Sequence, residues 1–401
     1  MLAIRPLASP LNPPAQVAAA VARVAGQLER RRVAHRFVTG AAEEPDALLM
    51  VTGGTEREAL AAIERMPGPA ILLAHGELNS LPAALEVLGR LRQGGRRGRI
   101  YPTDDHDDSL ARLVRHLEVR RRLQSARLGR IGAPSDWLVA SMPSPELVRA
   151  AWGPEVVDVP MAELLKALRE ADGSEAGRVR EDATAGAAAV REPSVHDLDA
   201  AARVTVALRA IVRAHRLDAC TVRCFDLVSE AGTTGCLALS WLQDEGIAAG
   251  CEGDVPATVT LLWLHAMTGR PSFMANPQET DPAHNTLWLA HCTIARRLVS
   301  RYELRSHFES SLGVGIAGEV APGPATLARI GGADLRGLTA WDAEVVASGH
   351  HPARCRTQVQ LRLAADVREL LAHPLGNHHV LAPGQHAAEL REYHDLFVAP
   401  A

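Results

Sequence analysis

A carboxylate in a glycine-rich segment is the first feature of the sequence that could do chemistry. The segment 250–256 (GCEGDVP) follows a short apolar run and precedes a long one. In parallel α/β sheets, ligands bind at the carboxyl ends of the strands, where a carboxylate can hold a divalent cation or move a proton. We interpret Glu252 as a functional residue of this kind and Asp254 as the N-cap of the helix that begins near Pro256.

Two adjacent histidines, His378 and His379, form the second candidate and stand just before the apolar run 380–382. Neighbouring residues of a strand point to opposite faces, so at most one of these imidazoles is expected to face Glu252. A glutamate oxygen and a histidine nitrogen suit manganese, with an open position for the oxygens of a polyol. The alternative is a hydrogen-bonded pair of surface histidines.

The third candidate is the segment His307-Phe308-Glu309, which precedes Ser310. If this segment is extended, His307 and Glu309 lie on one face and reach the same substrate. The alternative is a polar strand edge with Phe308 in the core. His291, which ends another apolar run, is expected to be a satisfied core histidine rather than a ligand.

Further polar side chains could bind the hydroxyl groups of a substrate. This set contains Asn276, Arg223, Asn377, His379 and Arg356. For Arg356 a structural role is favoured, because arginine is common throughout the chain.

The composition describes a soluble globular protein of two or three domains. The chain has 401 residues, of which 47% are apolar and 22% charged, and its net charge is −4. This balance argues against an extended nucleic-acid interface. The longest apolar runs fall short of the roughly 20 residues of a membrane span, and no apolar signal segment is visible, so no membrane partner and a cytoplasmic location are expected.

The six cysteines all lie between Cys220 and Cys355 and include no C-x2-C pair. They are expected to be buried thiols of a reduced intracellular protein. A metal site at Cys220 and Cys224 is disfavoured.

Strands and helices are expected to alternate through most of the chain, which predicts parallel sheets covered on both faces. The expected elements of the first part are 47–51, 56–65, 70–74, 83–91, 99–101 and 109–124. A second series has strands at 128–131, 137–141, 156–159, 219–223 and 247–251 and helices at 145–151, 195–215, 234–245 and 256–267. Residues 171–193 are expected to form a loop or a frayed helix.

After residue 269 the pattern changes to short, turn-bounded strands, which predicts a barrel or a sandwich. The expected strands are 272–275, 286–291, 314–320, 326–330, 345–347 and 358–363, with a helix only at 385–396. The expected fold is α/β, with two Rossmann-like parallel-sheet domains (1–126 and 127–269) and a β-rich, barrel-like C-terminal domain (270–401). Glu252 belongs to the second domain and His378 to the third, so the chemistry is expected where these two domains meet.

Several of these segments together resemble a known family, the L-fucose/L-arabinose isomerase-like proteins, in their shorter fucose-isomerase-like branch. The segments are 221–227 (TVRCFDL), 250–254 (GCEGD), 272–276 (SFMAN), 289–293 (LAHCT), 307–310 (HFES) and 376–379 (GNHH). Segments 78–82 (LNSLP) and 132–138 (GAPSDWL) also fit the amino-terminal domains of this branch. The resemblance therefore spans nearly the whole chain.

The resemblance implies two Rossmann-like domains, a β-barrel-like domain and a site for Mn²⁺, or another divalent cation, at their junction. The implied activity interconverts an aldose and a ketose, so the partner is a small-molecule sugar. The implied assembly is a homotrimer or a homohexamer, in which the first domain of a neighbour closes the cleft. Glu252 matches the first metal carboxylate, His378 (or His379) the late metal histidine, and His291 an additional histidine of the arabinose branch.

The sequence departs from the family at the second acidic ligand, where it has Asn276. An enediol mechanism needs two groups that move a proton between neighbouring carbons, and an amide cannot be a base near neutral pH. Either Glu252 works with Glu309, His307 or Asp254, or the metal is held weakly and the chemistry has changed. We expect the former, and therefore a metal-dependent aldose–ketose isomerase acting on a free or modified sugar.

Two other functions remain open from the sequence. The first is a non-catalytic carbohydrate-binding or regulatory homologue that has lost a metal ligand. The second is a metal-assisted epimerase.

Overall fold

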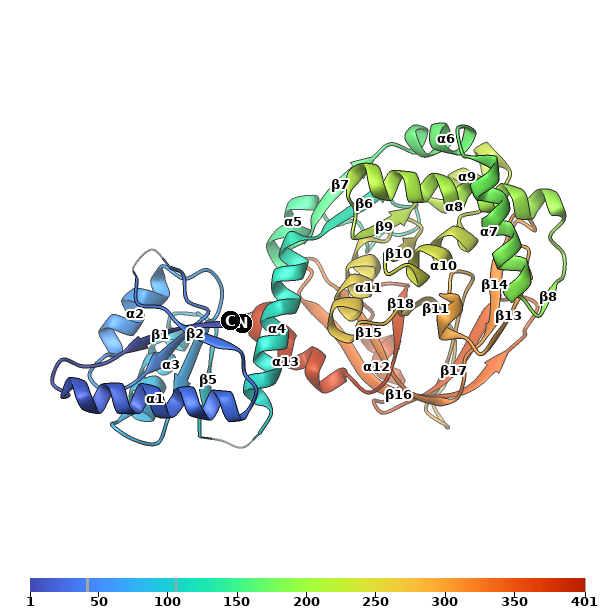
Figure 1. Ribbon diagram of the computed structural model, residues 1–401. Coiled ribbons are helices and arrows are strands. Elements are labelled where there is room, and N and C mark those ends of the chain that lie inside the picture. The colour runs from blue at the N-terminus through green and yellow to red at the C-terminus, as the bar shows by residue number, and fades with distance from the viewer. Residues whose placement is uncertain (41–42, 105–106, 401) are drawn as a thin grey trace. The chain divides into compact units, whose positions relative to one another are not determined.

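The computed structural model describes residues 1–40, 43–104 and 107–400. The chain divides into two compact units, Met1–Glu118 with Glu392–Ala401, and Val119–Arg391, which are described separately (Figure 1). In the described residues, no helix has both the length and the apolar character needed to cross a lipid bilayer.

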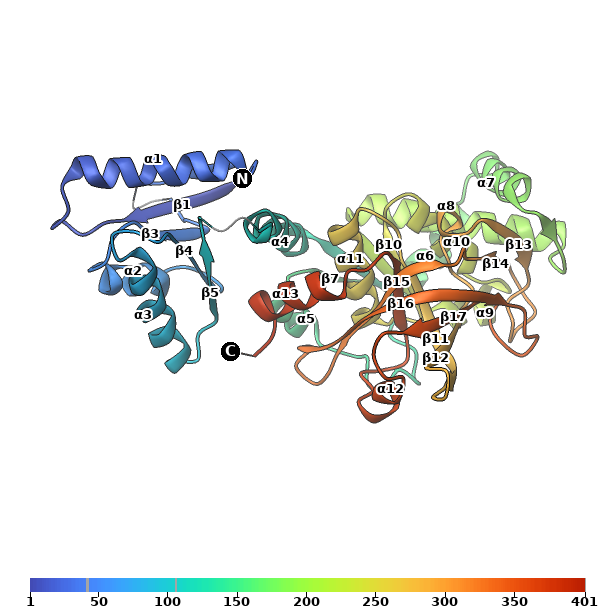
Figure 2. The same ribbon diagram turned by 90° about the horizontal axis from the view of Figure 1, so that it is seen from below.

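The first unit is built on a parallel sheet with the strand order β2-β1-β3-β4-β5. The strands are β1 (Leu2–Leu7), β2 (His35–Phe37), β3 (Ala47–Met50), β4 (Ala70–Ala74) and β5 (Gly98–Pro102). Helix α1 (Pro14–Arg30) covers one face, and α2 (Glu56–Glu64) and α3 (Ser80–Gln93) cover the other (Figure 2). Because both faces are covered, β3 and β4 are buried along their whole length.

The second unit begins with another parallel sheet, in the order β10-β9-β6-β7. The strands are β6 (Arg127–Ile131), β7 (Glu155–Val159), β9 (Ala219–Val222) and β10 (Ala248–Cys251). Its helices are α5 (Pro145–Ala151), α6 (Met161–Arg169), α7 (Gly173–Gly186), α8 (Val195–His215), α9 (Cys224–Ala231), α10 (Cys236–Asp244) and α11 (Val255–Thr268). Helix α4 (Ser109–Ser125) spans the division between the two units.

The rest of the second unit is a closed antiparallel barrel in the order β11-β12-β17-β16-β15-β18. Its strands are β11 (Phe273–Asp281), β12 (Thr286–His291), β15 (Gly323–Gly331), β16 (Gly337–Gly349), β17 (Thr357–Leu363) and β18 (His379–Pro383). Outside it lie η1 (Arg296–Leu298), α12 (Arg368–Ala372) and a small sheet of β8 (Ala189–Val190), β13 (Arg301–Arg305) and β14 (Gly315–Glu319). Helix α12 contradicts the expectation of a helix only at 385–396, and α13 (Ala387–Phe397) spans the division between the two units. The expected fold class, with parallel-sheet domains and a β-barrel, is confirmed.

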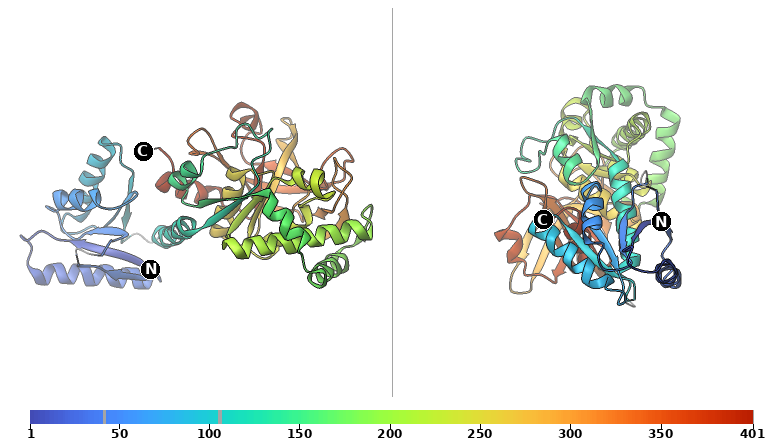
Figure 3. Two further views of the ribbon diagram at one scale, coloured as in Figure 1. Left: turned by 90° about the horizontal axis from the view of Figure 1, so that it is seen from above. Right: turned by 90° about the vertical axis from the view of Figure 1, so that its left-hand side faces the viewer.

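Helices α7, α8 and α10 share one hydrophobic core with the barrel strands of the second unit, and Figure 3 shows these green helices and orange strands. Leu237 and Trp241 of α10 belong to the same cluster as Phe273, Leu327 and Leu361 of the barrel. Burial of this continuous apolar surface stabilises the two layers against each other. The division at residues 126 and 269 stays a prediction.

Two of the expectations for residues 127–269 are wrong. Residues 137–141 form turns and no strand, because Leu138 N–H donates to the Ser135 carbonyl at 2.9 Å and Ser141 N–H to the Leu138 carbonyl at 2.8 Å. Most of residues 171–193 form the well-defined helix α7. Asp172 caps this helix by accepting a 2.8 Å hydrogen bond from Glu175 N–H, and Val179 is buried in the core.

Candidate active site

Glu252 stands directly after strand β10, in a backbone conformation that few residues other than glycine adopt. Its φ is 62°, and Gly253 follows with φ of 75°. A Cβ at Gly253 would lie 2.6 Å from the Cα of Pro134, so a glycine is required there. This tight turn places the Glu252 side chain at the edge of a cavity and lets Asp254 begin helix α11.

Asp254 caps α11, as expected, but it also has a second partner. One carboxylate oxygen accepts a 2.8 Å hydrogen bond from Ala257 N–H. The other lies 3.0 Å from Nδ1 of His378, which is fully buried. Because Nδ1 faces a carboxylate, the proton of the ring is held there and Nε2 points the opposite way.

The Nε2 atom of His378 lies 3.5 Å from Oε1 of Glu252. The expectation that these two residues, from distant parts of the sequence, share a site is therefore confirmed as geometry. His379 is also buried, but its Nδ1 lies 3.0 Å from the carbonyl oxygen of Asn377 and it does not line the cavity. The structure thus brings one histidine of the pair to Glu252, and this histidine stands one residue before strand β18 (His379–Pro383).

His291, at the end of β12, completes a group with Glu252 and His378. Donor atoms of the three residues all lie within 4.8 Å of one another. The rings of His291 and His378 are 5.5 Å apart, and His291 Nδ1 lies 2.9 Å from the hydroxyl of Thr293. The sequence pattern favoured a buried histidine with hydrogen-bonded ring nitrogens and no role as a ligand. His291 is buried and hydrogen-bonded, and it also lies within reach of an ion shared with Glu252 and His378.

The donor atoms of this group fit a divalent cation. The amide oxygen of Asn276 and Nε2 of His378 are buried without a hydrogen-bond partner among the described residues. Buried polar atoms are normally satisfied, so two such atoms beside a carboxylate indicate a missing ligand. One carboxylate, two imidazoles and one amide oxygen form a mixed oxygen and nitrogen set that suits Mn²⁺, Fe²⁺ or Zn²⁺.

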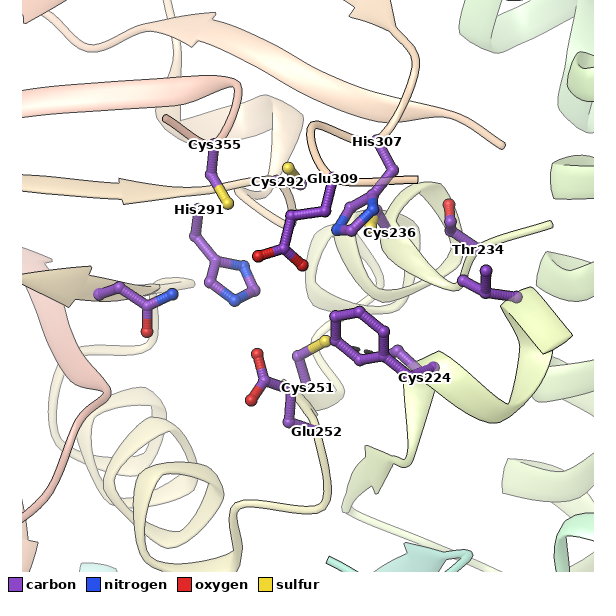
Figure 4. A pocket seen from close by; sticks show the side chains of 13 residues that line it. Cys224, Thr234, Cys236, Cys251, Glu252, His291, Cys292, His307, Glu309 and Cys355 are labelled. Carbon is purple, nitrogen blue, oxygen red and sulfur yellow. Dashed lines mark hydrogen bonds between the residues drawn. The ribbon is translucent and has the colours of Figure 1, made fainter. Parts of the chain in front are cut away.

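His307 and Glu309 also line the cavity, together with Glu252, His291 and Asn276. Figure 4 shows the two glutamate side chains directed into the same space, with the rings of His291 and His307 beside them. The arrangement therefore offers a second carboxylate close to the metal-type donors.

The expected strand at His307 is wrong, although His307 and Glu309 do face the same cavity, as that strand would have placed them. Ser311 N–H donates to the His307 carbonyl at 2.9 Å, and the Ser310 hydroxyl lies 3.1 Å from His307 Nδ1. These bonds close a turn after β13. The turn, and not the alternation of a strand, places both His307 and Glu309 on the side of the cavity.

Burial and nearby charges shift the pKa values of the three central side chains, upward for His378 and downward for His291 and Glu252. Burial would lower the pKa of His378, but Asp254 and Glu252 together raise it to about 9. For His291, burial followed by the nearby charge of His378 lowers the pKa to about 4. Burial opposes ionisation of Glu252, yet the close approach and charge of His378, with the hydrogen bond from Trp137, hold its pKa below the ordinary value. Without a cation, the site therefore contains an imidazolium between two carboxylates and a neutral second imidazole.

Arg329 is a structural part of the site that the sequence analysis missed. This fully buried residue of β15 donates to Asp254 at 3.2 Å, to the Ser141 hydroxyl at 2.7 Å and to the carbonyl of His378. Its charge and that of His378 outweigh burial and lower the pKa of Asp254 to about 2. An arginine inside an apolar strand is a signal in the sequence, but its partner is not.

Trp137 was also missed as a site residue. Its indole N–H donates to Oε2 of Glu252 at 2.5 Å, and its ring stands edge-on to Phe225 at 4.9 Å. The tryptophan thereby fixes the oxygen of Glu252 that does not face His378. It lies in the turn segment taken for a strand, and no pattern in the sequence marks it.

The remaining substrate-binding candidates do not line the cavity. Arg223 forms ion pairs with Asp136 and Asp226 at 3.2 and 3.0 Å. Arg356 donates to the carbonyl of Ser306 at 2.6 Å, and Asn377 is exposed. Arg356 therefore supports the turn that carries His307, in agreement with the structural role favoured for it.

Comparison with known proteins relates the chain to sugar isomerases. It is 25% identical over 231 residues to the sulfoquinovose isomerase of Clostridium sp. (strain MSTE9), an alignment that covers 56% of this chain and 52% of that protein. It is 25% identical over 211 residues to the sulfoquinovose isomerase of Alkalicoccus urumqiensis, covering 50% and 47%. The sulfoquinovose isomerase of Priestia aryabhattai is 22% identical over 210 residues, covering 48% and 44%.

No protein-family model matches the chain. The aligned region spans about half the length of the curated relatives that the chain matches. Distant similarity to sugar isomerases and the group formed by Glu252, His291 and His378 are thus two separate observations about one molecule.

Proposed function

We propose that this protein is an aldose–ketose isomerase that acts on a small sugar in the cavity beside Glu252. The observation that carries the proposal is the meeting of Glu252, His291 and His378, of which Glu252 and His291 line a cavity that Glu309 also lines. The similarity to proteins named sulfoquinovose isomerase supports the reaction class.

Four residues would hold the cation, namely Glu252, His291, His378 and Asn276. A bound divalent ion such as Mn²⁺ would polarise the carbonyl and hydroxyl oxygens of the sugar. Asp254 and Thr293 act on the ligands by fixing the orientation of the two imidazoles. Trp137 restrains the carboxylate of Glu252 in the same way.

The proton transfer needs a base that faces the substrate. Asn276 cannot provide one, and Asp254 is fully buried between His378 and Arg329, away from the cavity lining. Glu309 lines the cavity and has no hydrogen-bond partner among the described residues, so its carboxylate can take a proton from the carbon next to the carbonyl. Glu252 and Glu309 are the proposed pair that moves the proton, and His307 would contact the sugar oxygens.

The cavity itself favours a neutral sugar ring over a strongly anionic one at the metal end. Within the described part of the chain, its lining contains no arginine or lysine. A sulfonate or phosphate group would therefore have to lie away from Glu252. A substrate panel should include free aldoses and ketoses together with sulfonated and phosphorylated sugars.

Proton NMR of such a panel in deuterated water tests the proposal. The full chain, loaded with Mn²⁺, is expected to interconvert one aldose with its ketose and to introduce solvent deuterium at the carbon next to the carbonyl. A chain that binds Mn²⁺ and a sugar but exchanges no proton would instead be a carbohydrate-binding protein. Exchange that yields only an epimeric aldose would show the epimerase.

The proposed assembly is a homotrimer or a homohexamer. Light scattering of the purified chain at several concentrations measures the subunit number, and a stable monomer that isomerises a sugar would contradict this part of the proposal.

A further inference from the structure

Cysteine side chains lie on several sides of the candidate cavity (Figure 4). Five of the six cysteines line it, and Figure 4 shows their side chains around Glu252 and His291. They are Cys224, Cys236, Cys251, Cys292 and Cys355. Buried cysteines commonly serve as small apolar groups, which explains their burial but not a direct contact between two sulfurs.

Cys224 and Cys251 make such a contact, with 2.8 Å between their sulfur atoms. The fold brings them together because β9 and β10 are parallel neighbours, with Val222 opposite Cys251. Cys224 follows two residues later, and its thiol turns back to the carbonyl of Val222 at 3.3 Å. A disulfide bond is about 2.05 Å long, so a small movement of the side chains would suffice to form it.

We propose that Cys224 and Cys251 are a modification site, at which hydrogen peroxide converts the two thiols to a disulfide. The sulfur of one cysteine attacks a peroxide oxygen, the O–O bond breaks, and one water leaves, which gives a sulfenic acid. The second sulfur attacks the first, the S–O bond breaks, and another water leaves. Two thiols and one peroxide thus become one disulfide and two waters.

The cavity gives the oxidant access to this pair. Both sulfurs belong to residues of the cavity lining, whereas Cys220 is fully buried in β9 and lies outside the lining. Cys292, with Cys236 and Cys355 as its neighbours, forms a second cluster in the lining of the same cavity. Because these three thiols meet the same cavity, they are the internal comparison for the proposal.

A disulfide at this position would act on the proposed active site, and this consequence rests on the proposed function. Cys251 is bonded to Glu252, and Cys224 precedes Phe225. Phe225 stands against Trp137, which donates to Glu252, and also against His307 at 5.8 Å. Movement of the two sulfurs toward each other would therefore shift the backbone at Cys251 and, through Phe225, the ring of Trp137. Both hold the Glu252 carboxylate in place, so the activity would fall.

The experiment is a thiol map of the folded protein with and without hydrogen peroxide, followed by dithiothreitol. Free thiols are blocked by an alkylating reagent, and the chain is cut after arginine and glutamate. This digestion separates 224–230 (CFDLVSE), 231–245 and 246–252 (GIAAGCE), which contain Cys224, Cys236 and Cys251 in turn. Peroxide is expected to link 224–230 to 246–252, with loss of two free thiols, and dithiothreitol to reverse the link.

Two variants serve as controls. Cys224→Ser should abolish the link, and Cys236→Ser should keep it. The proposal is overturned if both target cysteines remain open to alkylation in the oxidised protein, or if the link joins other cysteines. The map of the unmodified chain decides the question even if Cys224→Ser fails to fold.

Activity separates the two proposals. Isomerisation should fall in step with the disulfide and return with dithiothreitol, and a disulfide that leaves the rate unchanged would overturn the link to Glu252. If the reduced chain isomerises no sugar, the proposed function is wrong. The disulfide proposal is then still tested, because the linked peptides are identified without any measurement of activity.

Discussion

Nδ1 of His378 lies 3.0 Å from the carboxylate of Asp254, a residue 124 positions earlier in the chain. The same carboxylate caps helix α11 and pairs with Arg329, so the histidine is tied to the best-buried part of the second unit. A carboxylate behind a metal-binding imidazole fixes its orientation and strengthens it as a ligand.

Replacement of Asp254 by asparagine should weaken cation binding, because an amide can still cap the helix but cannot hold the imidazole as a carboxylate does. We expect the affinity for Mn²⁺ to fall by about 10- to 100-fold. Isothermal titration of the metal-free protein measures it, and circular dichroism checks the fold. Asp158→Asn, at an exposed pair with Arg130, is the control and should bind Mn²⁺ as the unmodified chain does.

Glu252→Gln and Glu309→Gln should each slow isomerisation while the protein stays folded. A positioned acid–base group contributes roughly 10²- to 10⁴-fold to a rate, and an amide of the same shape removes that contribution. The measurement is kcat with the sugar identified in the NMR panel. Glu344→Gln, at an exposed pair with Arg362 on the barrel, controls for loss of charge. A wild-type rate in either site variant would remove that residue from the proton transfer.

Asn276→Asp should strengthen cation binding, since it replaces a neutral oxygen by a charged one in a group that already contains Glu252. An increase on the order of tenfold in the affinity for Mn²⁺ is expected. Asn276→Ala, which removes the oxygen, should lower the affinity. If neither change alters it, the side chain faces the sugar and not the metal.

Arg329→Met should destabilise the second unit strongly, because it removes one of the two cationic partners of the buried Asp254 carboxylate and leaves only His378. Loss of one member of a buried pair costs roughly 3–5 kcal/mol of unfolding free energy. Urea unfolding followed by fluorescence measures the change. Arg130→Met breaks an exposed pair and should cost less than about 1 kcal/mol. Equal losses in the two variants would contradict the structural role given to Arg329.

Glu192 should contribute to stability above its unfolded pKa and lose this contribution in acid. Its hydrogen bonds with Arg305, chiefly, and with Ser306 N–H lower its pKa from 4.5 to about 2. The folded state therefore holds fewer protons than the unfolded state between these values, and stability falls as the pH falls through them. Glu192→Gln should flatten this dependence in urea unfolding between about pH 7 and about pH 3. An unchanged slope would show that the bond is not formed in solution.

Local sequence patterns were sufficient for many helices and strands, and for the conformation of one turn. The segment 250–256 showed a strand end, a glycine turn and a capping aspartate, since each depends on a few neighbouring residues. Strands β3, β4 and β5 of the first unit and most barrel strands also followed from apolar runs bounded by turn residues, whereas β1 and β2 were not predicted. Patterns failed at residues 137–141 and at His307, where hydrogen bonds between turn residues outweigh strand propensity.

Only the tertiary structure decided which residues share the site. The choice of His378 over His379 depends on the register of β18 against β11 and on the carboxylate of Asp254. The role of Arg329 depends on two charges that meet only in the core, and that of Trp137 on a hydrogen bond between segments 115 positions apart. Such contacts join residues that are far apart in the sequence, and no helical or strand periodicity reveals them. The sequence therefore identified the chemical groups, and the packing of the second unit determined which of them are partners.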